Sequence, residues 1–61
     1  MDENIKCFLS EYEILAERYT QYKKAGDLEM AKITEAKKNT LKWVLYKLGY
    51  QKNVMEIERE Y

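Results

Sequence analysis

The sequence contains no proline and only two glycines, Gly26 and Gly49. These two residue types are the strongest breakers of helices, so the chain has few places at which a helix must end. The stretch from Glu3 to Ala25 has neither, and it is rich in residue types that favour helix. The sequence therefore predicts an all-α fold with long helices.

Histidine is absent, and Cys7 is the only cysteine. A single cysteine excludes an intrachain disulfide, and without histidine there is no Cys/His zinc set and no Glu-x-x-His pair of the di-iron type. The chain also has no Gly-rich phosphate loop and no Ser/His/Asp or Cys/His set, and no basic residue is placed to activate Cys7. We expect no catalysis, no metal and no cofactor.

The sequence has no net charge, because its eleven basic and eleven acidic residues cancel. This balance disfavours attraction of the whole molecule to nucleic acid or to an acidic membrane. No run approaches the ~20 apolar residues of a membrane span. Residues 1–4 lack the basic and apolar regions that open a secretory signal. We expect a cytoplasmic protein without membrane association.

The chain is short, with 61 residues, which predicts one helical domain over 1–61. A chain of this size buries only about 60% of the surface that it exposes when unfolded. Small cores of this kind usually need a disulfide, a metal or self-association. Since the first two are disfavoured, we expect the protein to form a homodimer.

The residues from Ile5 to Tyr22 carry an apolar stripe of helical period, which predicts a helix over 3–25. Asp2 or Asn4 is expected to cap its first turn, while Ser10 with Glu13 offers the alternative of a later start. The stripe consists of Ile5, Phe8, Tyr12, Leu15, Tyr19 and Tyr22, with Leu9 and Ala16 beside them.

A reversal is expected at Gly26 and Asp27, because glycine can close a helix in the left-handed conformation and aspartate can cap the next one. The second helix is predicted over 28–48, antiparallel to the first. Lys37 lies near the centre of its stripe, where it either extends its ammonium outward or marks the rim of an interface. The predicted stripe is Met30, Ile33, Leu41, Val44, Leu45 and Leu48, with Thr34, Lys37 and Thr40 in the gaps between them.

A third, short helix is predicted over 54–61, after a stop at Gly49 and a capping signal formed by Asn53 and Glu56. Its apolar positions Val54, Ile57 and Tyr61 repeat at three and four residues. A helix of this length is not stable alone, so it either docks on the hairpin or frays.

Trp43 and Tyr46 lie away from the stripe of the second helix, and an exposed tryptophan beside a tyrosine is typical of a binding hot spot. One interpretation makes them anchors for a partner or a second copy. The other has the third segment cover the tryptophan within the chain, and under both interpretations Trp43 is buried. Tyrosines in the first stripe also favour an interface, because each hydroxyl needs a polar neighbour. The predicted partner-binding residues are Trp43, Tyr46, Tyr12, Tyr19 and Tyr22.

The segment 37–52 holds five lysines, no acid and three interleaved aromatic residues. Basic residues alternating with stacking side chains suit RNA or single-stranded DNA. Against this interpretation, the lysines point in different directions around the helix. A nucleic-acid site at Lys38, Lys42 and Lys47 is therefore the alternative hypothesis.

Two short motifs resemble known proteins. Residues 22–31, YKKAGDLEMA in one-letter code, look like the turn of a tetratricopeptide repeat, but no second repeat follows. The motif LKWVL at 41–45, in a helix that follows a Gly-Asp reversal, resembles short helical-hairpin proteins of phages and prophages. That resemblance implies a small protein that binds and modulates a host or phage protein. The length and hairpin form are also similar to plasmid copy-control RNA-binding hairpins.

Together these patterns predict an antiparallel helical hairpin with a short third helix, assembling into a helical bundle. The predicted function is non-catalytic binding and regulation of another protein. The alternatives are nucleic-acid binding and a purely structural, self-assembling bundle.

Overall fold

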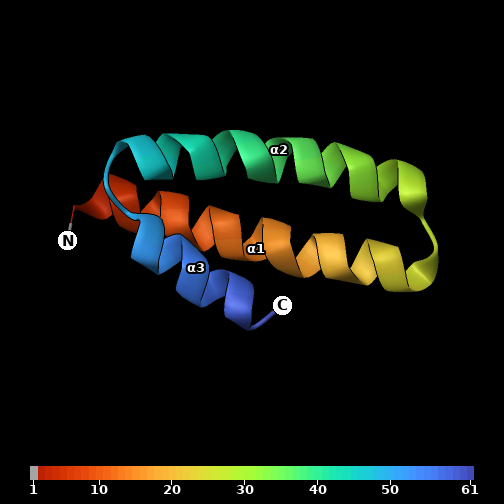
Figure 1. Ribbon diagram of the computed structural model, residues 1–61. Coiled ribbons are helices and arrows are strands. Elements are labelled where there is room, and N and C mark those ends of the chain that lie inside the picture. The colour runs from red at the N-terminus through yellow and green to blue at the C-terminus, as the bar shows by residue number, and fades with distance from the viewer. Residues whose placement is uncertain (1) are drawn as a thin grey trace.

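A computed structural model describes residues 2–61, and within this range the chain forms three α-helices and no strand. The helices are α1 (Glu3–Ala25), α2 (Leu28–Lys47) and α3 (Gln51–Arg59). α1 and α2 run antiparallel along nearly their whole length, and α3 folds back beside them (Figure 1). The predicted all-α hairpin with a short third helix is confirmed.

The reversal between α1 and α2 follows from local chemistry. Gly26 has φ 77°, in the left-handed region, and its N–H donates to the carbonyl of Lys23 at 3.1 Å. The next amide, of Asp27, donates to the carbonyl of Tyr22 at 2.9 Å, so the last turn of α1 is closed. The Asp27 carboxylate then accepts the amide of Met30 at 3.2 Å and caps α2.

α1 has the predicted bounds, and the Asp2 carboxylate caps it by accepting the amide of Asn4 at 2.7 Å. The alternative of a later start at Ser10 is wrong. α2 ends one residue before the predicted position, at Lys47.

The predicted bounds of α3 are wrong, because the helix begins at Gln51 instead of Val54 and ends at Arg59. Gly49 takes a left-handed φ of 91°, and the amide of Tyr50 donates to the carbonyl of Leu45 at 2.9 Å. The hydrogen bond closes the end of α2 and the glycine reverses the chain, so α3 begins directly after Tyr50. Asn53 lies inside the helix and does not cap it; the residue before the helix, Tyr50, makes no side-chain capping bond.

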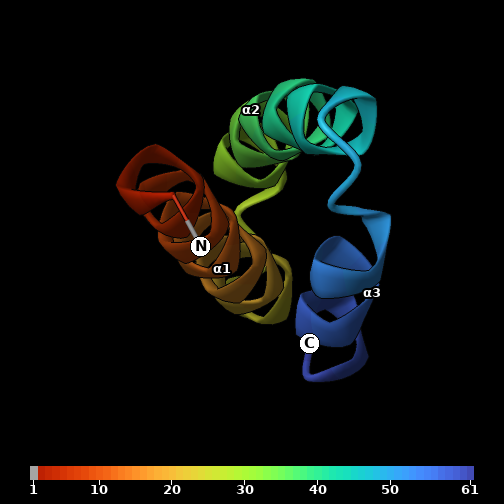
Figure 2. The ribbon, with the colours of Figure 1, turned by 90° about the vertical axis from the view of Figure 1, so that its left-hand side faces the viewer.

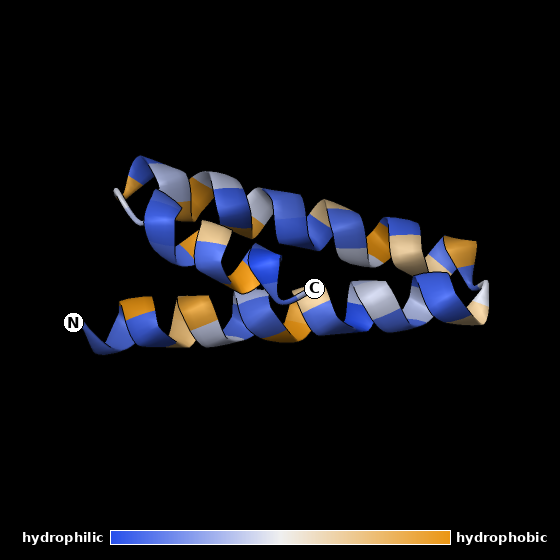
Figure 3. Ribbon diagram, turned by 60° about the horizontal axis from the view of Figure 1, so that its bottom comes forward, coloured by the Kyte–Doolittle hydropathy of each residue, from blue (hydrophilic) through white to orange (hydrophobic). Residues whose placement is uncertain are grey.

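The centre of the core takes one residue from each helix: Tyr12 of α1, Leu45 of α2 and Val54 of α3 are all fully buried. Five partly buried residues pack around them: Leu9, Leu41, Tyr46, Tyr50 and Ile57. Apolar bands recur along all three helices (Figure 3). α3 therefore docks on the hairpin, and Val54 is the residue that joins it to both other helices.

The face of α2 that meets α1 differs in part from the predicted stripe. Thr34 and Leu45 of that stripe are buried, and so is Ala31, which lies outside it, while Met30, Ile33 and Leu48 are 37%, 44% and 52% exposed. Small side chains let two helix backbones approach closely, so α2 turns its small residues to α1 and leaves larger ones outside. As a result, only part of the apolar surface of α2 is used within the chain.

The molecule is elongated, with extents of 36 × 19 × 16 Å and a radius of gyration of 11.6 Å. A compact domain of 61 residues would have a radius of about 10.5 Å. The accessible surface is 4596 Å², against about 4,200 Å² for a monomer of this mass. No described helix combines the length and apolar character needed to cross a membrane.

Candidate functional site

A buried tyrosine and two charged groups link the three helices. The Tyr12 hydroxyl of α1 donates to Glu58 Oε1 of α3 at 2.7 Å, and Lys42 Nζ of α2 lies 3.1 Å from the same oxygen. Burial, followed by the bond to Glu58, raises the pKa of Tyr12 far above its usual range. The Tyr12 hydroxyl, followed by Lys42, holds the pKa of Glu58 below its usual value. This network fixes α3 and was not anticipated from sequence.

Trp43 stands on the outer surface of α2 with 63% of its side chain exposed. Lys47, one turn further along, holds its ammonium 5.4 Å from the centre of the tryptophan ring. The prediction that Trp43 is buried within the chain is wrong, because α3 packs on Tyr12 and Leu45 instead. We call Trp43 and Tyr46 the aromatic flank.

The other residues predicted to bind a partner occupy different places. Tyr12 is in the core and bonded within the chain, so it offers no surface for a partner. Tyr46 is half-buried against the core, and Tyr19 and Tyr22 are half-buried on α1. Of the five predicted residues, Trp43 alone is mainly exposed.

A groove of about 460 Å³ runs between α1 and α2, and no residue of α3 lines it. Viewed from the end, α3 lies on one side of the α1/α2 pair (Figure 2). The lining residues are Glu11, Leu15, Ala36, Lys37, Thr40, Leu41 and Val44.

Exposed apolar residues continue the groove at helical spacing. Phe8 lies seven residues before Leu15 on α1 and is 39% exposed. On α2, Ile33 lies four residues before Lys37, and Leu48 four after Val44. We call the groove together with Phe8, Ile33 and Leu48 the open face.

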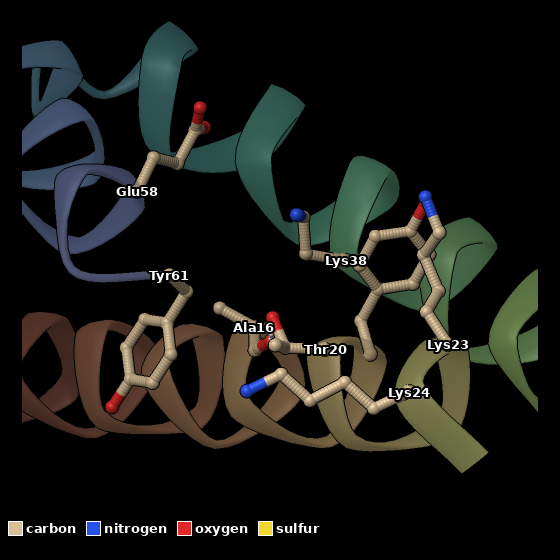
Figure 4. A pocket seen from close by; sticks show the side chains of 8 residues that line it. Ala16, Thr20, Lys23, Lys24, Lys38, Glu58 and Tyr61 are labelled. Carbon is tan, nitrogen blue, oxygen red and sulfur yellow. Dashed lines mark hydrogen bonds between the residues drawn. The ribbon is translucent and has the colours of Figure 1, made fainter.

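A second hollow, of about 360 Å³, gathers lysines from two helices beside α3 and forms a basic cleft. Lys23 and Lys38 lie 5.4 and 4.9 Å from the ring centre of Tyr19, and Lys24 extends along α1 toward Tyr61 (Figure 4). The one acid that lines it, Glu58, is already bonded to Tyr12 and Lys42. The full lining is Ala16, Tyr19, Thr20, Lys23, Lys24, Lys38, Glu58 and Tyr61.

The three lysines of the nucleic-acid hypothesis have three different neighbours. Lys38 lies over Tyr19 in the basic cleft, Lys42 pairs with Glu58, and Lys47 lies over Trp43. The structure therefore does not bring them into one phosphate-binding strip. The lysines that do gather with Lys38 are on α1 and lie outside segment 37–52.

Among residues 2–61, no three or more Cys, Asp and Glu side chains are arranged to hold a metal ion. Comparison of the chain with protein-family models, curated proteins and solved structures gives no match.

Proposed function

We propose that this protein is a non-catalytic binding module that regulates another protein by occupying a surface on it. The observation that carries the proposal is the exposure of Trp43, the only tryptophan, on the outer side of α2. Tryptophan is among the residue types that contribute most to protein interfaces when they become buried there. The resemblance to phage and prophage hairpin proteins favours a host protein as the partner.

The surroundings of Trp43 suit a preorganised contact. Lys47 lies over the ring and Tyr46, three residues on, is held against the core. A side chain that is already ordered loses less conformational entropy when a partner covers it. The contact with Lys47 restricts the Trp43 ring, so the aromatic flank is suited to act as an anchor.

Trp43→Ala tests the proposal, with Met55→Ala as the matched control. Met55 is also an exposed apolar residue, at 51%, but it lies on α3. We expect Trp43→Ala to abolish capture of a specific protein from a lysate of the source cells, with helicity unchanged, and Met55→Ala to retain it. Equal capture by both variants would contradict the role of Trp43.

Fluorescence of the single tryptophan gives a second measurement. In the free protein, an aqueous quencher should reach Trp43 readily, because most of the ring is exposed. Addition of the captured partner should shield it and shift its emission to shorter wavelength. An unchanged spectrum on binding would place the contact elsewhere.

A second candidate function is the binding of nucleic-acid phosphates, and the basic cleft is the observation that favours it. Lys23→Glu with Lys24→Glu should then abolish salt-dependent RNA binding, while Lys47→Glu with Lys52→Glu should leave most of it. Equal loss in both pairs would indicate nonspecific attraction to the net charge.

A further inference from the structure

We infer that the open face binds a second copy of this chain, forming a symmetric four-helix dimer in which α1 of each copy lies along α2 of the other. The two α3 helices then lie on the outside. This inference concerns a different surface from the aromatic flank, and it stands whether or not Trp43 contacts a partner.

The single chain leaves much of its apolar surface unused. Seven hydrophobic side chains are buried among the described residues, whereas nine large ones are exposed. Three of the nine, Phe8, Ile33 and Leu48, belong to the open face. A core this small is marginal in a chain of 61 residues, and association is the ordinary way to enlarge it.

The charges on the open face identify the occupant. Glu11 on α1 and Lys37 on α2 line the groove, and neither belongs to the ion pairs of the described residues, which are Lys6–Glu3 and Lys42–Glu58. Within the groove, one acid lies on one helix and one base on the other, so this part of the surface is complementary to itself. In a two-fold dimer every such contact occurs twice, with the roles of the copies exchanged.

The same charges select the symmetry axis. An axis parallel to the helices places Lys37 of one copy over the helix that carries Glu11 of the other. An axis across the helices would lay α1 on α1 and α2 on α2, so that like charges meet. Both arrangements make every helix antiparallel to its neighbours, as in up-and-down four-helix bundles, so it is the charges that distinguish them.

The size of the face is sufficient. The molecule is 36 Å long, and two helices side by side are roughly 20 Å wide with their side chains. One whole side of the hairpin thus has a footprint of about 700 Å², so a second copy laid along its full length could cover nearly the ~800 Å² found on each side of a standard interface. The half-buried Leu41 and Val44 at the centre of the open face would form the dry part of the contact, above Leu15, which is already buried in the single chain.

Charge reversal gives a direct test. In Glu11→Lys both helices of the open face carry positive charge, and in Lys37→Glu both carry negative charge. Each variant alone should dimerise at least about tenfold more weakly than the wild type. An equal mixture should form heterodimers as tight as the wild-type dimer or tighter, measured by native mass spectrometry with one variant labelled with nitrogen-15.

Ile33→Glu, with Met55→Glu as control, tests the apolar part of the face. Both residues are exposed in the single chain, so both variants should fold, as circular dichroism will show. Only Ile33→Glu should shift the protein to monomer. The inference is overturned if the wild type remains monomeric at high concentration, if Ile33→Glu dimerises as the wild type does, or if the charge-reversed mixture fails to form heterodimers. Loss of partner capture in Trp43→Ala with dimerisation intact would separate the two surfaces.

Discussion

At the scale of single residues, Tyr12 holds the three helices together through both its ring and its hydroxyl. The ring contacts the core residues Leu45 and Val54, and the hydroxyl donates to Glu58. A buried hydroxyl without a partner would be costly, so the ring and the hydrogen bond depend on each other. Glu58 lies 46 residues away from Tyr12.

Tyr12→Phe should lower the free energy of unfolding by about 1 to 2 kcal/mol, because a hydrogen bond to a charged acceptor is lost while the ring stays packed. Urea denaturation followed by circular dichroism measures the change. Tyr22→Phe is the control, since Tyr22 is half-buried and outside the network. Equal effects of the two substitutions would show that the bond to Glu58 adds nothing.

Acid should weaken the folded state through Glu58. Because the Tyr12 hydroxyl and then Lys42 lower the pKa of this carboxyl, the folded state favours its charged form. The resulting stabilisation is complete above pH 4.5, the ordinary value for glutamate, and is lost as the pH falls through the lower pKa of folded Glu58. Denaturation midpoints measured from pH 6 down to about 2.5 should therefore fall less in Glu58→Gln than in the wild type. Parallel curves would contradict this assignment.

At the scale of the elements, both interhelix turns depend on a glycine in the left-handed conformation. Gly26 has φ 77° and Gly49 has φ 91°, and an added Cβ would meet no atom within 4 Å at either position. The requirement for glycine is thus one of backbone conformation and does not arise from crowding.

Gly26→Ala should therefore destabilise the protein by about 1 to 2 kcal/mol, the cost of a left-handed backbone for an ordinary residue. Gly26→Asn should cost less, because asparagine tolerates this conformation better. Thermal unfolding of the two variants checks the order. Equal stability of Gly26→Ala and the wild type would mean that the turn has rearranged.

The two long helices and their turn could be predicted because their signals are local. The caps Asp2 and Asp27 and the break at Gly26 lie within a few residues of the helix ends that they define. The start of α3 could not be predicted in the same way, since the pairing of Asn53 with Glu56 resembles a cap but falls inside the helix.

The sequence also could not predict in full which face of α2 packs against α1. Its apolar period includes Met30, Ile33 and Leu48, which are exposed, whereas Ala31, outside the predicted stripe, is buried. Choosing between these faces requires knowledge of how closely the two backbones approach, which periodicity does not contain. For the same reason the exposure of Trp43 could not be told from burial under α3.

At the scale of the whole molecule, α3 makes the two sides of the hairpin unequal. It covers Tyr12 and Leu45 on one side, and the α1/α2 groove on the open face has no cover (Figure 2). From the length of the chain we predict self-association, because a core of this size is small. The structure shows which apolar surface α3 leaves exposed, namely the open face. The charges of Glu11 and Lys37 are the reason for which we propose a second copy as its partner.

Sedimentation equilibrium of the wild-type protein over a range of concentrations measures this property most directly. The chain has a mass of 7.4 kDa. We predict an apparent mass that rises with concentration and levels off at twice this value, as a closed two-fold dimer requires. A mass that stays at that of one chain, or one that grows without limit, would contradict the account.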